Sequence, residues 1–163
     1  MLGDSGKADA ASRRALAEAT STKTELGLVF ANIFSVMKCL FLEQHDAARD
    51  HAKAALKGAE KMKFPQWIAQ ANLQLARNAD LIGDPAALAA LQDATAKYLE
   101  TGMVLARPYA QVWIAEAMIR KGAYAQALTV LDDLEAFTQT SKEQYYDGFA
   151  QKARALAAEN LWQ

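Results

Sequence analysis

The chain has 163 residues, 52% of them hydrophobic and 23% charged, so it can form one domain with a sizeable core and is too apolar to be disordered. Its 18 basic and 19 acidic residues give a formal net charge of -1, which argues against nucleic acid or an anionic membrane as partner. Only 8 glycines and 3 prolines occur, and alternating β-branched runs are missing, so the sequence predicts an all-α protein.

Apolar residues at helical spacing, together with capping and turn signals, predict eight helices. Asp4 or Ser5 is the expected N-cap of the first helix. The clearest junction is Gly83-Asp84-Pro85, which combines a C-cap glycine, an N-cap and a proline suited to a first helical turn. In chain order the predicted helices span residues 4–19, 25–44, 44–62, 65–82, 85–100, 108–121, 123–137 and 142–159.

The second of these helices contains the only stretch apolar enough to be a membrane candidate. It covers residues 26–42 and includes Lys38, which places it at the short limit for a bilayer span. A helix covered by neighbours on both flanks has the same composition, so we expect this one to be buried in the protein. Cys39, the single cysteine, is expected to be a buried apolar side chain. The N-terminal residues lack the apolar core of a secretory signal, and a cytoplasmic location is expected.

A short phrase that recurs roughly every 40 residues links the helices. It opens at Gly3, Glu43, Gly83 and Gly122, at intervals of 40, 40 and 39 residues. Five positions after each opening comes an apolar residue, namely Ala8, Ala48, Leu88 and Ala127. An interval of this length, filled by two amphipathic helices, is typical of an α-solenoid. The sequence therefore predicts a right-handed α-solenoid of about eight antiparallel helices, forming one domain over residues 1–163.

These positions resemble the tetratricopeptide repeat, which has a small residue at position 8 of its first helix and an alanine at position 20. The corresponding pairs in this chain are Ala115 and Ala127, Ala76 and Leu88, and Val36 and Ala48. Val36 and Leu88 depart from the motif and the interval is longer than usual, so the repeats are degenerate. The resemblance implies antiparallel helix pairs with a concave groove that binds a protein or peptide.

The last third of the chain is similar to the C-terminal helical repeats of multidomain bacterial regulators. In those proteins an ATPase-like module is often joined to a nucleotide cyclase or a DNA-binding domain. The shared elements are Pro108-Tyr109, Ala115-Glu116-Ala117, the run from Gly122 to Leu128, and Tyr145-Tyr146-Asp147. The similarity covers about residues 60–158. It implies a sensing or partner-binding arm of a longer signalling protein, without catalysis of its own.

In such repeats the second, fifth, ninth and twelfth positions point into the concave groove. They are Gln70, Leu73, Arg77 and Asp80 in one repeat and Tyr109, Val112 and Glu116 in the next. We expect Arg77 and Glu116 to orient a partner by charge, and Leu73, Tyr109 and Val112 to supply buried contact area. An amphipathic helix or an extended peptide suits a groove of this mixed character.

The first repeat would present an unusually apolar wall to the same groove. Its residues at these positions are Phe30, Ile33, Met37 and Leu40. The alternative is that the superhelix curves weakly and that these side chains pack on neighbouring helices.

The first predicted helix lacks the helix that should precede and pair with it. Ala15 and Leu16 would then have one uncovered side. Either the chain is a piece of a longer protein, which we favour, or this edge binds another subunit. A homodimerisation scaffold is therefore an alternative function, and a small-molecule effector domain with a ligand held between repeats is another.

Catalytic signals are missing from the sequence. It has no nucleophile motif and no Gly-rich phosphate loop, so we expect no enzymatic activity. His45 and His51 are six residues apart and do not share a helix face as an i,i+4 pair would, so no metal and no cofactor are expected. The basic stripe of Lys53, Lys57 and Lys61 is interpreted as a solvated outer face.

Overall fold

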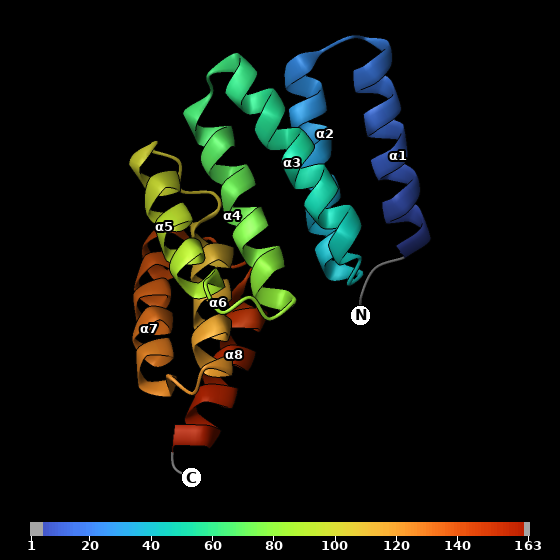
Figure 1. Ribbon diagram of the computed structural model, residues 1–163. Coiled ribbons are helices and arrows are strands. Elements are labelled where there is room, and N and C mark those ends of the chain that lie inside the picture. The colour runs from blue at the N-terminus through green and yellow to red at the C-terminus, as the bar shows by residue number, and fades with distance from the viewer. Residues whose placement is uncertain (1–4, 162–163) are drawn as a thin grey trace. The chain divides into compact units, whose positions relative to one another are not determined.

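The computed structural model describes residues 5–161, which form eight α-helices joined by short turns and no strand (Figure 1). The all-α prediction is therefore confirmed. The helices are α1 (Ser5–Ser21), α2 (Glu25–Phe41), α3 (His45–Met62), α4 (Pro65–Leu81), α5 (Ala87–Glu100), α6 (Arg107–Arg120), α7 (Tyr124–Ser141) and α8 (Asp147–Leu161). The chain divides into two compact units, one ending at Asp84 and the other beginning at Pro85.

The predicted helix bounds differ from the observed ones mainly at two starts. Helix α5 begins at Ala87 because Pro85 and the residue after it form a turn instead of the first helical residues. Helix α8 begins at Asp147, well after the predicted start at residue 142. Lys142 has a φ of 61° and ends α7, so a new helix cannot begin there.

A left-handed backbone residue recurs at a nearly constant interval in the turns. The residues with positive φ are Lys23, Glu43, Lys63, Gly83, Gly102, Gly122 and Lys142. Each full helix pair therefore takes 39 or 40 residues, the interval indicated by the sequence. The next N–H bonds back to the helix, as from Gln44 to the Cys39 carbonyl at 2.9 Å. Gly3 and Asp4, the predicted first opening and cap, lie outside the described residues.

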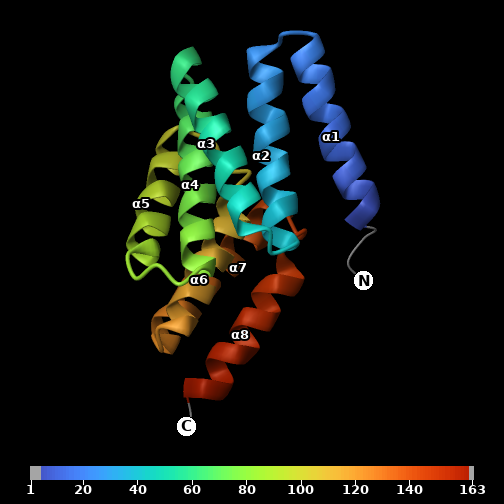
Figure 2. The same cartoon turned by 45° about the vertical axis from the view of Figure 1, so that its right-hand side comes forward.

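In the first unit, α2 lies between α1 and α3 (Figure 2) and also contacts α4. One core cluster joins Val29 and Ile33 of α2 to Ala55, Ala59 and Ala71. A second joins Val36 and Cys39 to Ala48 and Ala52. Cys39 is 1% exposed, which confirms its predicted burial, and this burial raises the pKa of its thiol.

In the second unit, α6 packs against α5, α7 and α8. The Tyr109 ring lies 4.7 Å from that of Trp113 and 5.6 Å from that of Tyr146. The proline–aromatic start of α6 and the aromatic pair before α8 thus meet in one cluster. The Arg107 guanidinium lies 4.4 Å from the centre of the Phe137 ring, which ties the start of α6 to α7.

Within residues 5–161, none of the helices combines the length and the hydropathy needed to cross a bilayer.

Gly58 tests how closely α2 and α3 approach each other. A Cβ atom at Gly58 would lie 2.7 Å from Cγ2 of Val29, and a β-branched valine has few rotamers to move to. Gly58→Ala should therefore lower the free energy of unfolding by about 1–2 kcal/mol, although alanine favours a helix by about 1 kcal/mol. Gly148→Ala on α8, where nothing lies within 4 Å, should raise it slightly. Urea unfolding followed by circular dichroism measures both, and equal stabilisation by both would contradict the close approach.

Candidate functional site

The predicted groove residues of the first unit are buried on α4. Gln70, Leu73, Arg77 and Asp80 are between 0% and 9% exposed. Arg77 Nη1 donates to Asp80 Oδ2 at 2.9 Å, so its charge is already met by a carboxylate on the same helix. Leu73 is fully buried and lies in the interior instead of on a surface.

The predicted groove residues of the second unit lie on α6 and are covered to different degrees. Val112 is 1% exposed and belongs to the core formed with α7 and α8. Tyr109 is half-buried in the aromatic cluster, and Glu116 is half-buried. Of the seven residues, Arg77 and Asp80 are brought together as a pair. Binding of a partner in a concave groove stays a prediction.

The apolar wall expected on α2 is also largely internal. Ile33 is 4% exposed in the core, and the ring of Phe30 makes an edge contact with Trp67 at 4.4 Å between centroids. For these two side chains, the alternative that they pack on neighbouring helices is confirmed.

The predicted edge on α1 has a different environment. Ala15 is exposed and Leu16 is half-buried, and Ala19 is the one buried residue among those described in α1. Within the described part of its unit, α1 contacts only α2. One side of α1 is therefore open to solvent, and it is the side on which the sequence placed an uncovered edge.

A groove of about 700 Å³ runs between α1 and α2. The α1 wall consists of Ala8, Ala11, Ser12, Ala15, Glu18 and Ala19, and the α2 wall of Gly27, Phe30, Ala31, Phe34, Ser35 and Lys38. Phe34 is 69% exposed in the middle of α2. An exposed phenyl ring thus faces water beside a wall of alanines, so the groove is apolar and accessible.

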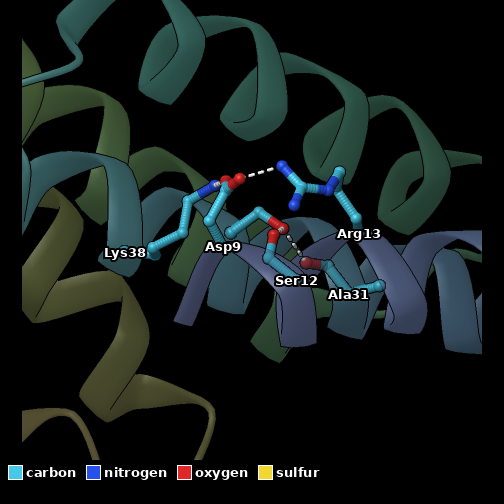
Figure 3. A network of polar contacts seen from close by, with 6 residues as sticks. Asp9, Ser12, Arg13, Ala31 and Lys38 are labelled. Atoms are coloured by element: carbon cyan, nitrogen blue, oxygen red, sulfur yellow. Dashed lines mark hydrogen bonds and ion pairs between the residues drawn. The ribbon is translucent and has the colours of Figure 1, made fainter. Parts of the chain in front are cut away.

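An ion pair fastens one end of α1 to α2 beside the groove (Figure 3). Lys38 Nζ donates to Asp9 Oδ1 at 2.9 Å, and Arg13 also pairs with this carboxylate. The hydrogen bond from Lys38 holds the pKa of Asp9 below its usual value. Lys38 is only 13% exposed, so its ammonium is committed to this contact.

A pair of serines forms the second polar link between α1 and α2. The Oγ atoms of Ser12 and Ser35 are 2.7 Å apart, and Ser35 donates to the Ala31 carbonyl at 2.6 Å. Since the Ser35 proton is used in that bond, Ser12 is the donor between the two hydroxyls. The α1–α2 contact therefore relies on polar groups more than the alanine-rich α2–α3 contact does.

A second cavity of about 420 Å³ opens between α7 and α8 and is more polar. Its lining includes Lys142, Asp147 and Arg154. Arg154 pairs with Asp132 at 2.6 Å and with Glu135 at 3.2 Å, so two carboxylates compensate its charge. Among residues 5–161, no three His, Cys, Asp or Glu side chains are grouped to hold a metal ion.

The two histidines of α3 link helices, a role that the sequence did not reveal. His45 Nδ1 lies 3.2 Å from Asn78 Oδ1 on α4, and His51 Nδ1 lies 2.8 Å from Asn32 Oδ1 on α2. Hydrogen bonds between helices far apart in sequence leave no local pattern, so only the structure shows them.

No family model, curated protein or solved structure was found to match this chain. The resemblance to tetratricopeptide repeats and to bacterial regulators therefore remains an inference from the residues quoted above. The site is interpreted from its own geometry.

His51 makes the stability of the first unit depend on pH. Asn32 donates its amide N–H to the Leu28 carbonyl at 2.8 Å, so its oxygen accepts from His51 Nδ1–H. Burial, and next the nearby Lys38, lowers the pKa of His51 below 6.5. The unfolded chain therefore binds a proton first as the pH falls through this value, and the folded state loses stability.

Unfolding free energies at about pH 7.5 and about pH 5.5 measure this effect. We expect the wild type to lose more stability on acidification than His51→Gln, whose amide can still donate to Asn32. Equal losses in the two proteins would contradict the assignment.

Proposed function

We propose that this chain is a protein-interaction module without catalysis of its own, and that it binds its partner on the groove between α1 and α2. The observation that carries the proposal is the 69% exposure of Phe34 beside the alanines of α1. Contiguous apolar surface of this kind on a small soluble protein marks an interaction site. The mainly buried positions on α4 and α6 make the concave groove the weaker candidate.

We further propose that the helices belong to a degenerate tetratricopeptide-like, right-handed solenoid. Two observations support this. Helix α2 contacts α4, and α6 contacts α8, as the first helices of successive repeats do. The left-handed turn residues also return every 19 or 20 residues. In this proposal the chain acts in the cytoplasm within a longer bacterial signalling protein, where partner binding shifts the state of the attached domains.

Self-association through the same groove is the second candidate function. The exposed ring of Phe34 and the exposed Ala15 favour it, because a second copy could cover them as well as a different protein could. A small-molecule effector role would use the polar cavity between α7 and α8.

Two alanine substitutions on α1 test the interaction function. Ala15 lines the groove, whereas Ala17 is exposed on the same helix and does not line it. We expect immobilised wild-type chain and Ala17→Glu to retain the same protein from an extract of the source organism. Ala15→Glu should lose it, because a carboxylate in an apolar interface is left unpaired.

Quantitative mass spectrometry of the retained proteins measures the difference, and circular dichroism checks that both variants fold. If nothing retained by the wild type depends on Ala15, the proposed interaction site is wrong.

A further inference from the structure

The open groove has a filled counterpart in the same unit, 40 residues further along the chain. Helices α3 and α4 follow α1 and α2 at this offset, and the left-handed residues Lys23 and Lys63 in the two turns keep it. On α1 the groove is lined by Ala8, Ala11, Ala15 and Glu18. The positions 40 residues later on α3 are Ala48, His51, Ala55 and Gly58.

All four α3 positions contact α2. Ala48 and Ala55 are 0% exposed and belong to the two clusters that contain apolar residues of α2. His51 hydrogen-bonds Asn32, and Gly58 lies so close to Val29 that no Cβ would fit. The face of α3 that corresponds to the open wall of α1 is therefore covered by α2.

The other wall repeats in the same way. Phe30 and Phe34 line the open groove on α2, and adding 40 to each gives Gln70 and Gln74 on α4. Gln74 Nε2 donates to the Ile33 carbonyl of α2 at 3.1 Å. Gly27 and Ala31 correspond likewise to Trp67 and Ala71, which both pack against α2. Helix α2 thus fills the groove between α3 and α4.

We propose that the groove between α1 and α2 binds an amphipathic helix of a partner protein, seated as α2 is seated on α3 and α4. The inference rests on the proposed interaction function and names the class of partner. The helix runs antiparallel to α1. It presents an apolar stripe with the spacing of Val29, Ile33, Val36 and Cys39, the residues by which α2 is buried.

Charge at one end of the groove specifies the partner further. Glu18 is exposed and stands where α3 has Gly58, the residue that Val29 touches. The partner residue in that register faces a carboxylate, so a lysine or arginine fits there. This is also the end at which a helix antiparallel to α1 begins, where a carboxylate complements the helix dipole. At the other end, Lys38 and Asp9 already balance each other.

The size of the groove favours one helix over a second copy of the chain. Helix α1 has 17 residues and is therefore about 25 Å long, and one helix about 10 Å wide covers its open face. A stable dimer buries about 800 Å² on each partner, which is more than this strip provides.

The chain's own last helix is also a poor occupant. Lys23 precedes α2 and Lys142 precedes α8, both in the left-handed conformation, so they align the two helices. The position of Ile33 in α2 is then taken in α8 by Lys152, which is exposed. A second copy that placed α8 in the groove would bury this ammonium without an observed partner.

Fluorescence anisotropy with a labelled synthetic helix tests the inference on the full chain. The peptide has the length of α2, valine, isoleucine, valine and leucine at the spacing of its buried stripe, arginine opposite Glu18, and alanine, glutamine and lysine elsewhere. We expect it to bind wild type and Ala17→Glu equally and Ala15→Glu at least about tenfold more weakly. A peptide of the same composition with the stripe scrambled should not bind.

A charge exchange tests the register. Glu18→Lys should weaken binding of the arginine peptide about two- to fivefold, as should glutamate in place of the peptide arginine on the wild type. The two changes together should restore binding, because the pair is re-formed with reversed signs. Additive losses would show that the helix is not seated in this register.

Three results would overturn the inference, and they separate it from the proposed function. If neither Ala15-dependent capture nor peptide binding up to about 100 µM is seen, both fail. If capture depends on Ala15 but no helical peptide binds, the interaction function stands and the helix inference is wrong. If light scattering finds a dimer that Ala15→Glu dissociates, the occupant is a second copy of the chain.

Discussion

The seating of α2 on α3 and α4 is the contact on which the first unit depends. Val29 and Ile33 pack on alanines that leave almost no distance between the helices, and Gly58 has no space for a Cβ. Small residues at such a crossing let two helices approach closely and bury apolar surface along their whole length. Because α1 and α2 repeat α3 and α4, the same seating also defines the shape of the groove that stands open.

The helices and their 40-residue interval were predictable, because alanine positions and turn residues are local signals. Individual side chains were not: Leu73 and Val112 were expected at a surface and are buried, since a single sequence does not say which side of an apolar helix has a neighbour. Phe34 shows the opposite error. It lies in a helix expected to be covered on both flanks, and it is 69% exposed. The exposure of Ala15 agrees with the expected open edge, because the repeat placed no helix before α1.

The polar attachment of α1 gives the groove a consequence for regulation. Ser12 and Asp9 hold α1 to α2 by hydrogen bonds and an ion pair, whereas α3 is held to α2 by fully buried alanines. A helix bound in the groove would cover the open alanines of α1 and complete a core like the one around α3. Partner binding would therefore stabilise α1 through the linkage between binding and folding.

The exposure of alanine methyl groups in solution tests the central claim most directly. In a methyl-labelled sample with a soluble paramagnetic agent, we expect strong relaxation of the methyl groups of Ala8, Ala11 and Ala15, which line the open groove. The equivalent methyl groups of Ala48 and Ala55, at 0% exposure, should be nearly unaffected. Equal protection of both sets in the free chain would contradict the account, because it would mean that the groove is already covered.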